Sequence, residues 1–448
     1  MVLVVWSLSA STLADPLNEC PSRAFLSQRT NATLYAINLV TGHFELLEDR
    51  MGAGKINAIG FSVHDRYFYA WSYQHDSVAR IGDDYQIESM NMQNITNNGF
   101  FVGDVAVTEN AYYVYRRGGN YGLYRIPLNP DADDYLQMSR VVDGSTLDLR
   151  IFDLAFHPTN GTAYAVDSSG RLWEINVQSG SATQLANVGQ TGTFGAGYFD
   201  VEGRLYFSRN KDGNVFVVDI DQQQYTASLF ALGPSSSTND GARCALAPVT
   251  DSNNTDIDFG DAPQSYGTML ADNGARHGLS LNPSLYLGDG VDGESDASPA
   301  PLADDSVDGN DDEDGVDFAT GLQAGNTAIL VVRAAAVGNL NAWIDVNQSG
   351  TFDAGEQIIS DRTVTEGTNL VAVNIPASAD VGDTWARFRL SSSSGVPPTG
   401  GVSDGEVEDY PVTIGASDSA TVWYPSKATV LQPLREGYQT VAESEAPI

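Results

Sequence analysis

Basic residues, cysteines and long apolar runs are all scarce in this sequence. The 448 residues include 23 lysines and arginines against 58 acidic residues, which gives a formal net charge of −35. Such a balance repels nucleic acid and anionic membrane surfaces, and it makes cations the natural partners. The five histidines show no metal-ligand spacing, and the sequence contains no GxSxG motif and no phosphate-binding glycine-rich loop. We therefore expect a protein without catalytic activity.

One long apolar run is present, at the start of the chain. The stretch "MVLVVWSLSASTLADP" is too short to span a bilayer, and it places Thr12 and Ala14 where a signal peptidase would inspect them. We interpret residues 1–14 as a signal peptide of a secreted or cell-surface protein with no membrane span; a buried first strand is the alternative. The two cysteines, Cys20 and Cys244, agree with export, since an even number in an oxidising compartment favours a disulfide.

Residues 20–249 contain a loose repeat of strand-like segments. The segments "NAIGF", "GDVAV", "FDLAF", "GAGYF" and "GARCAL" begin at residues 57, 103, 152, 195 and 241, and further apolar segments follow each of the first four. Four strands in a unit of roughly 40 to 50 residues are typical of a β-propeller blade. The sequence predicts an all-β protein that begins with a β-propeller, with five blades expected and six as the alternative.

The last repeat supplies only its innermost strand. The strands it lacks stand at the other end of the domain, in "SRAFLSQ", "TLYAINLVTG" and "HFELLED", so we expect the ring to close with one blade made from both ends. This closure places Cys244 on the innermost strand of the closing blade and Cys20 just before its neighbour. We predict a disulfide between them that clasps the ring; two buried thiols that only pack together are the alternative.

The second half of the chain has a different composition. After a polar linker at 250–256, the residues from 251 to 409 include 28 acidic and five basic side chains, so about two thirds of the net charge lies in this third of the chain. Residues 257–320 are rich in aspartate, glycine and proline and show little periodicity. The two halves therefore predict two different kinds of domain.

Residues 327–414 alternate between apolar and polar positions. In "WARFRLS", the apolar side chains are expected to face a core while Arg387 and Arg389 face outward. We predict a β-sandwich domain over residues 257–414, with the acidic loops lying on it, and a linker or truncated tail over 415–448. Arg387 and Arg389 could pair across strands with the nearby carboxylates, which we interpret as architecture; these carboxylates are Glu406, Glu408 and Asp409.

The segment "DVNQSGTFDAGE", residues 345–356, has the spacing of a calcium loop. In such a loop alternate residues turn oxygen atoms inward, a central glycine permits the sharp bend, and a final glutamate closes the oxygen shell. The ligand positions fall on Asp345, Asn347, Ser349, Thr351, Asp353 and Glu356. Because strands rather than helices flank the loop, we predict a structural calcium site; a polar hairpin that matches by accident is the alternative.

Two further stretches are still more acidic. "ADDSVDGNDDEDGVDF", residues 303–318, has eight carboxylates and no basic residue, and "DGVDGESD" precedes it. So many carboxylates in an ordered loop raise one another's pKa unless cations neutralise them, so these loops either bind calcium or are solvated spacers. The additional candidate ligands are Asp292, Glu294, Asp296, Asp311, Asp312 and Asp314.

Five motifs, in order, resemble the GEVED domain of bacterial secreted and cell-surface proteins. They are "DFGDAPQSYGT" at 258–268, "ARH" at 275–277, "NDDEDGV" at 310–316, "WIDVNQSGTFDAGE" at 343–356 and "DGEVEDYPV" at 404–412. The resemblance covers residues 256–415, and the first half is similar to the uncharacterised propeller-like domain that often precedes this one. The resemblance implies an exported, multidomain, calcium-stabilised surface protein with no settled activity.

These features favour adhesion, or binding of an extracellular protein or glycan, as the function. Trp71, Tyr73 and Tyr121, which we expect to be exposed in blade loops, are candidate contacts. One alternative is an extracellular polysaccharide-acting enzyme, which requires carboxylates or histidines with perturbed pKa values that converge at the propeller channel. The other is a lectin-like module, which requires a calcium site completed by its ligand.

Overall fold

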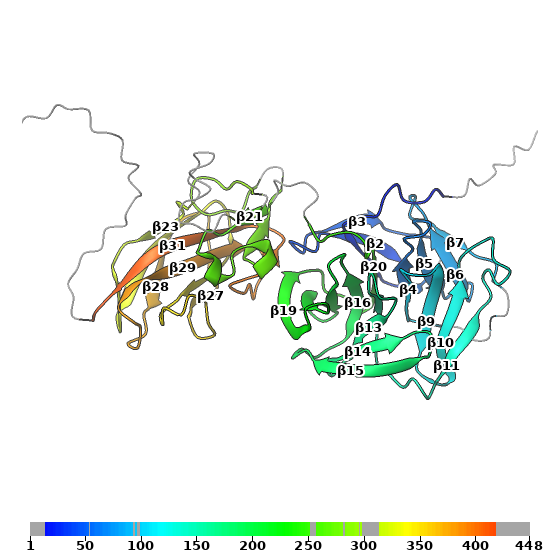
Figure 1. The fold of residues 1–448 in the computed structure, drawn as a ribbon. Helices are drawn as coiled ribbons and strands as arrows, with labels where there is room; N and C mark the ends of the chain where they lie inside the picture. Colours follow the sequence, from blue (N-terminus) through cyan, green and yellow to red (C-terminus); the bar gives the residue numbers. More distant parts are fainter. Residues whose placement is uncertain are drawn as a thin grey trace, which may run out of the picture.

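The structure, a computed structural model, describes residues 14–417 except 53, 93–94, 96–98, 251–256, 281–282, 295 and 298–312. Almost all of the segments interpreted as signal peptide, linker and C-terminal tail therefore lie outside the described residues. The described residues form strands and two short 3-10 helices, which confirms the all-β prediction. Figure 1 shows two bodies beside each other, a ring of sheets in blue to green and a C-terminal domain in yellow to orange.

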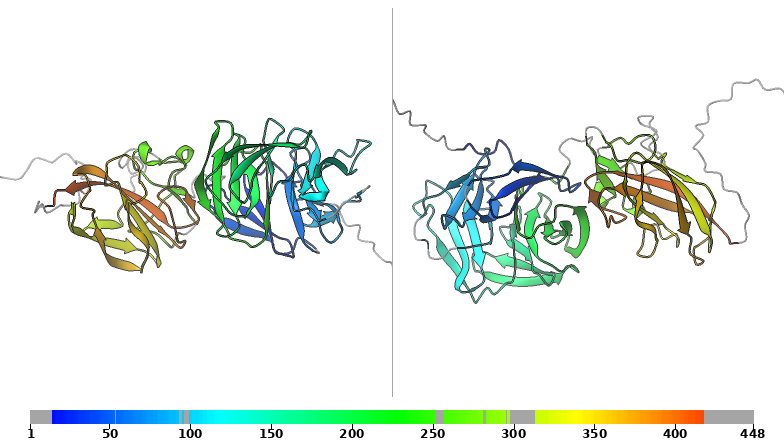
Figure 2. Two further views of the ribbon diagram at one scale, coloured as in Figure 1. Left: turned by 90° about the horizontal axis from the view of Figure 1, so that it is seen from below. Right: turned by 180° about the vertical axis from the view of Figure 1, so that it is seen from behind.

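The N-terminal body is a β-propeller made of four-stranded antiparallel sheets. Figure 2 shows the sheets arranged around a common axis. From the innermost strand outward, one sheet contains β20 (Asn239–Arg243), β1 (Ala24–Gln28), β2 (Thr33–Ile37) and β3 (Phe44–Glu48). The next two contain β4 (Ile56–Phe61), β5 (Phe68–Ser72), β6 (Ser77–Ile81) and β7 (Ile87–Ser89), and then β8 (Val102–Val105), β9 (Ala111–Arg116), β10 (Gly118–Pro127) and β11 (Ser139–Gly144). The last two contain β12 (Ala155–Phe156), β13 (Ala163–Val166), β14 (Arg171–Asn176) and β15 (Ser181–Asn187), and then β16 (Phe194–Phe199), β17 (Arg204–Arg209), β18 (Asn214–Asp219) and β19 (Gln224–Leu232).

The innermost strands close a ring. They contact one another in the order β20, β4, β8, β12, β16 and back to β20. The first of these sheets combines both ends of the domain, because β20 pairs antiparallel with β1 and brings Ala24 opposite Arg243 and Gln28 opposite Asn239. The predicted closure by one sheet made from both ends is confirmed.

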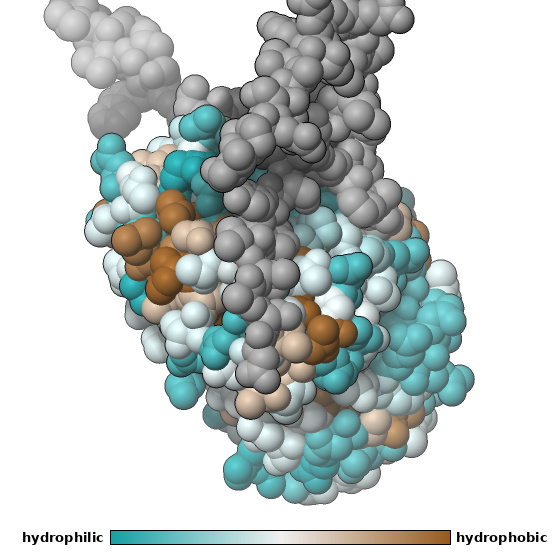
Figure 3. Space-filling view, turned by 90° about the vertical axis from the view of Figure 1, so that its left-hand side faces the viewer, coloured by the Kyte–Doolittle hydropathy of each residue, from teal (hydrophilic) through white to brown (hydrophobic). Residues whose placement is uncertain are grey.

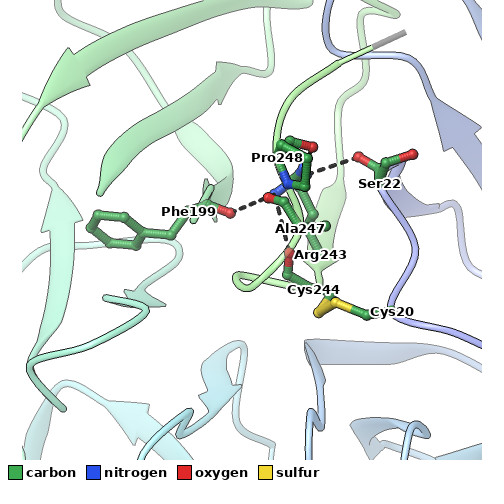
Figure 4. Close-up of a disulfide and its surroundings, with 7 residues drawn as sticks. All are labelled: Cys20, Ser22, Phe199, Arg243, Cys244, Ala247 and Pro248. Carbon is green, nitrogen blue, oxygen red and sulfur yellow. Dashed lines mark hydrogen bonds between the residues drawn. A yellow bond between two sulfur atoms is a disulfide. The ribbon is translucent and has the colours of Figure 1, made fainter. Parts of the chain in front are cut away.

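A disulfide between Cys20 and Cys244 fastens the closing sheet, as predicted. The two Cα atoms lie 5.6 Å apart, and the bridge links positions 224 residues apart in sequence. Next to it, the buried guanidinium of Arg243 donates hydrogen bonds to main-chain carbonyl groups (Figure 4), which belong to Ser22, Phe199, Cys244, Ala247 and Pro248. The arginine and the disulfide therefore hold both chain ends of the ring at one place.

The aromatic residues expected in exposed loops lie deeper than the sequence predicts. Trp71 is fully buried and packs edge to face against Phe100, with ring centroids 4.9 Å apart. Its strand is the second of its sheet, and side chains of second strands fill the space between neighbouring blades. Tyr73 and Tyr121 are partly exposed and pack against the same hydrophobic cluster, and Tyr121 lies in β10 rather than in a loop. The prediction of exposed loop positions is therefore wrong for Trp71 and only partly right for the other two.

The C-terminal domain has two sheets that share one hydrophobic cluster. The side chains of this cluster come from both sheets and include Leu330, Val371 and Phe388. One sheet has the order β23 (Val316–Phe318), β25 (Thr327–Ala334) and β28 (Gly367–Asn374), and the other has the order β24 (Leu322–Gln323), β31 (Glu406–Gly415), β29 (Gly382–Ser391), β26 (Gly338–Ile344) and β27 (Gln357–Val364).

An irregular segment connects the two bodies. It contains β21 (Ile257–Phe259), the 3-10 helices η1 (Gln264–Tyr266) and η2 (Leu270–Asp272), and β22 (Arg276–Gly278). Strand β22 runs parallel to β30 (Gly401–Val402), and β30 in turn pairs with β19 through Ala231 and Gly401. The outermost strand of one propeller blade is therefore extended by strands of the C-terminal domain.

The disulfide should contribute strongly to the stability of the propeller. Replacing both cysteines, Cys20→Ser with Cys244→Ser, removes a cross-link over a very long loop, and the loop-entropy model assigns about 5 kcal/mol to such a link. We expect urea unfolding of the double variant to show a loss approaching this value. A midpoint equal to that of the native protein would show that the ring closes without help from the disulfide.

Candidate functional site

The predicted calcium loop connects β26 to β27. Gln348 and Gly350 adopt left-handed backbone conformations, with φ of 53° and 84°. These two residues stand between the candidate ligands Asn347, Ser349 and Thr351. Their positive φ angles bend the chain, which favours placing these ligand side chains on one side of the loop. The glycine suits its position, because a side chain is strained at such a φ angle.

The first and last carboxylates of the loop are buried and hydrogen-bonded to its main chain. Asp345 accepts hydrogen bonds from the N–H groups of Ser349 (3.0 Å) and Gly350 (2.9 Å). Glu356 accepts them from Val346 (3.0 Å) and Asp353 (2.7 Å). Burial, and to a lesser extent the charge of Asp345, raises the pKa of Glu356. A cation placed here would relieve this unfavourable burial of negative charge.

The other four ligand positions are exposed and their side chains gather on one side of the loop. Asp353 lies 3.3 Å from the Asn347 amide nitrogen, 3.4 Å from Ser349 Oγ and 3.3 Å from Thr351 Oγ1. The four side chains therefore bring amide, hydroxyl and carboxylate groups together at Asp353, and the oxygen atoms of these groups are of the kind that calcium prefers. Among the described residues no cluster of three or more His, Cys, Asp or Glu side chains forms a metal site. The fit therefore rests on amide, hydroxyl and carboxylate oxygens together.

The additional acidic candidates that the structure describes fasten separate turns. Glu294 accepts the Phe259 N–H (2.9 Å), Asp296 accepts the Leu270 N–H (2.8 Å), and Asp314 accepts the Asp289 N–H (3.0 Å). The first two carboxylates hold the irregular segment, and the third holds the turn at Asp289. Asp292 has interactions of its own, and Asp311 and Asp312 lie outside the described residues.

The carboxylates of the "GEVED" string hold the acidic loops against β31. Glu406 accepts the Leu287 N–H, Glu408 accepts the Gly315 N–H (2.7 Å), and Asp409 accepts the Ala262 N–H (2.8 Å). All three side chains are buried. The motif therefore anchors segments that precede the two sheets of the C-terminal domain.

Arg387 and Arg389 are fully buried, so the prediction that they face outward is wrong. They do lie on the opposite face of β29 from the core, but the irregular segment and the 396–400 turn cover that face. Arg387 forms the predicted ion pair with Asp409, with nitrogen–oxygen distances of 2.8 and 2.7 Å. Arg389 instead donates to the His277 Nε2 atom (3.0 Å) and to carbonyl groups, including that of Gly400 (2.9 Å).

A third buried arginine, Arg276, joins the two domains. Its guanidinium donates to the carbonyl oxygens of Val40 (2.6 Å) and Phe230 (2.9 Å), which belong to two different propeller blades, and to that of Gly274 (2.7 Å). It also lies over the Phe230 ring, 4.4 Å from the centroid. Burial lowers the pKa of Arg276 to about 9, so the contact is made at the cost of desolvating a cation. The "ARH" motif gave no sign of this docking role.

A groove of about 790 Å³ opens beside this junction. The propeller contributes Asn38, His43 and Phe44, and the C-terminal domain contributes Leu285 and Asp404. Its volume lies in the usual range for ligand sites, which are often formed between domains. Sequence reasoning missed it because its walls come from segments more than 200 residues apart.

Three aspartates converge along the propeller channel, and sequence reasoning missed these as well. Asp240 accepts the Ile59 N–H (3.2 Å), Asp104 accepts the Phe156 N–H (3.1 Å), and Asp153 accepts the Gly197 N–H (2.7 Å). Each bond connects an aspartate of one innermost strand to the next blade. The signal was an aspartate in two of the aligned innermost segments, "GDVAV" and "FDLAF", and a third directly before "GARCAL".

The channel aspartates titrate far from their ordinary range. Burial raises the pKa of Asp104 to about 8, although this residue keeps some exposed surface. Burial also raises the pKa of Asp153 and Asp240, and repulsion among the three carboxylates adds to it. The channel thus has the convergence that the enzyme hypothesis requires, but each carboxylate is occupied by main-chain N–H groups of two blades.

Comparison with known protein families gives one match in each of these two bodies. Residues 25–246 match the model of a repeat of unknown function, DUF6923, and residues 339–413 match the GEVED domain. No curated protein is a match for the chain. A search of solved structures returned a gluconolactonase from Xanthomonas campestris at 17% identity, with 51% of this chain and 89% of that one covered and a TM-score of 0.34.

Two other solved structures also resemble part of this chain at low sequence identity. A chain of a nidogen/laminin complex is 11% identical, with 50% of this chain and 99% of that one covered and a TM-score of 0.34. TolB from Acinetobacter baumannii is 14% identical, with 50% and 54% covered and a TM-score of 0.32. The likeness concerns the fold, and the activities of these proteins are not assigned to this chain.

Removal of the Arg276 guanidinium should weaken the link between the domains. Arg276→Ala leaves carbonyl groups of two blades without their donor, at about 1–3 kcal/mol for each buried group left unpaired. We expect calorimetry to show a lower melting temperature and separate transitions for the two domains. Arg362→Ala, at an exposed position of β27, serves as the control. Native melting of Arg276→Ala would contradict this role.

The channel aspartates should make the propeller less stable as pH rises. When the pKa of a carboxyl group is higher in the folded than in the unfolded protein, the group favours the folded state most at pH values below its unfolded pKa. This contribution to the free energy of unfolding is lost as the pH rises through the folded-state pKa. Between about pH 4 and pH 8, Asp104 should lower the free energy of unfolding by up to about 1.4 kcal/mol for each unit of pH increase. The free energy of unfolding, measured with urea, should depend less on pH in Asp104→Asn than in the native protein. Identical slopes would contradict the raised pKa.

Proposed function

We propose that this chain, which carries a GEVED domain behind a repeat domain of the DUF6923 type, is an extracellular attachment protein stabilised by calcium and without catalytic activity. The domain combination fits a non-catalytic surface protein. The observation that carries the proposal is the loop between β26 and β27, where exposed side chains meet around Asp353 and the first and last residues, Asp345 and Glu356, are buried carboxylates.

Calcium would act in this protein as a structural ion. The residues that would hold it are the six loop positions, from Asp345 to Glu356, and bound calcium would supply positive charge to a part of the chain that has few cations of its own. Asp345 also accepts a hydrogen bond from the Tyr266 hydroxyl (2.8 Å), so order in the loop is passed to the irregular segment. Extracellular calcium is abundant enough to fill a weak site of this kind.

The surface of the C-terminal domain suits attachment to a partner. Val337, Leu370 and Val381 expose 64%, 68% and 60% of their surfaces. Figure 3 shows hydrophobic residues in small patches, in brown, among hydrophilic ones at this end of the molecule. The described residues contain no helix that is long and apolar enough to cross a membrane. A disulfide that closes the propeller is in keeping with an extracellular location.

The competing proposal, an enzyme that acts on extracellular polysaccharide, draws on the three channel aspartates. Their raised pKa values suit general acid chemistry. We favour the architectural role because Asp104 and Asp153 each accept hydrogen bonds from their own strand and from the next blade. A carboxylate used in this way has little freedom to exchange a proton with a substrate.

Calcium should raise the melting temperature of the full chain. For a dissociation constant of roughly 0.1 to 1 mM, an excess of calcium adds about 2 kcal/mol, or a few degrees, and magnesium adds less. Asp353→Ala removes an exposed ligand and should abolish most of this rise, while Glu366→Ala, an exposed carboxylate on the β27–β28 turn, should retain it. An equal rise in both variants, or none in the native chain, would refute the calcium site.

A further inference from the structure

The outer face of β29 is covered along only part of its length. Arg387 and Arg389 are sealed at one end by the irregular segment and by the 396–400 turn, to whose carbonyl groups they donate hydrogen bonds. Two residues toward the start of the strand, Trp385 is partly exposed, and Asp383 is exposed. The same face of the sheet is therefore closed at one end and open at the other.

A cavity of about 460 Å³ occupies the open end. The irregular segment forms one wall with Pro263 and Tyr266, and the calcium loop forms another with Gln348 and Gly350. The floor comes from β29 and β31, and its residues are Asp383, Trp385, Pro411 and Thr413. This volume is in the range of small-ligand sites.

The lining combines flat apolar surfaces with polar groups, one of which is the carboxylate of Asp383. Trp385 lies directly opposite Pro411 in the sheet, and its ring centroid is 6.4 Å from that of Tyr266. Asp383 accepts a hydrogen bond from the Thr413 hydroxyl (2.7 Å), and the Gln348 amide lies above them with a long bond to the Asp380 carbonyl (3.3 Å). None of the described residues that line the cavity is basic, so it does not suit an anionic ligand.

We propose that this cavity binds a neutral sugar ring of an extracellular glycan. The C–H face of the ring would stack on Trp385, and its hydroxyl groups would exchange hydrogen bonds with Asp383 and Gln348, which between them offer acceptors and a donor. The proposal deepens the attachment function and rests on it, because it names the class of partner that the C-terminal domain would hold.

The calcium loop and the cavity share structural elements. The Asp345 carboxylate accepts hydrogen bonds from the Gly350 N–H of one wall and from the Tyr266 hydroxyl of the other. An ion that fixes the position of Asp345 would therefore also restrict the movement of both walls of the cavity. Gln348 lies in the loop itself and adopts a left-handed conformation, which costs free energy and is held by its surroundings. Calcium should accordingly strengthen sugar binding without contacting the sugar.

The test uses the full chain in saturating calcium and neutral hexasaccharides of glucose (in α- and β-linked forms), mannose and N-acetylglucosamine as probes. Calorimetry and tryptophan fluorescence report binding. We expect at least one probe to bind with a dissociation constant on the order of 0.1 to 1 mM. Trp385→Ala should weaken this binding by about tenfold or more, and Asp383→Asn by a smaller factor. Val201→Ala, an exposed apolar residue of the propeller, is the matched control and should bind as the native chain does.

Each outcome separates this proposal from the calcium site. No binding of any probe at about 5 mM overturns the sugar site, even if calcium raises the melting temperature. Binding that survives in Trp385→Ala places the sugar elsewhere and also overturns it. Binding that is lost in Trp385→Ala supports the cavity, and if calcium leaves the melting temperature unchanged in the same preparation, only the calcium site fails.

Discussion

The contact of the Arg276 guanidinium with two propeller blades is the interaction on which the arrangement of the whole molecule depends. The side chain is fully buried and its hydrogen bonds go to carbonyl oxygens of both blades and of its own turn. Arg389 donates to the Arg276 carbonyl (3.0 Å), so the same residue is also held by the C-terminal domain. A continuous path of hydrogen bonds therefore leads from the core strand β29 to the propeller. A buried cation tolerates only well-placed acceptors, which makes this junction specific in its geometry.

The chain also has to accommodate a large excess of negative charge. It does so in two ways that the structure separates clearly. The carboxylates of β31 and of the channel are buried and accept main-chain N–H groups, so they fasten loops and blades. The exposed side chains at positions 347 to 353 instead meet around Asp353, which accepts hydrogen bonds from Asn347, Ser349 and Thr351. The first group fastens distant segments through main-chain donors, whereas the second is exposed and carries the oxygen types that calcium binds.

These two groups also connect stability to the proposed attachment. The irregular segment is anchored by Asp409 at one point and by Asp345, through Tyr266, at another. Its remaining contacts lead to Arg276 and the propeller. The cavity beside Trp385 thus lies between a part of the sheet that is covered and the loop proposed to bind calcium. If the loop binds calcium as proposed, the ion would help to order one wall of the cavity.

The sequence by itself determined the strand content, the closing sheet and the disulfide. Strand periodicity and turn residues are local signals, and the two cysteines lie beside the adjacent strands of the closing sheet, Cys20 before β1 and Cys244 directly after β20. It also located the loop at 345–356, because the ligand spacing of a tight loop is a property of consecutive residues. The pairing of Arg387 with Asp409 followed from their neighbouring strands.

Only the tertiary structure decided what covers each face and which distant groups meet. Alternation placed Arg387 and Arg389 opposite the core, but it could not show that a segment from residues 257–278 returns to bury them. Nor could it show that Trp71 lies between blades, that Arg276 reaches the propeller, or that three aspartates share a channel. These outcomes depend on contacts between residues far apart in the chain, and burial of a polar group is decided by the partners that the complete fold brings to it.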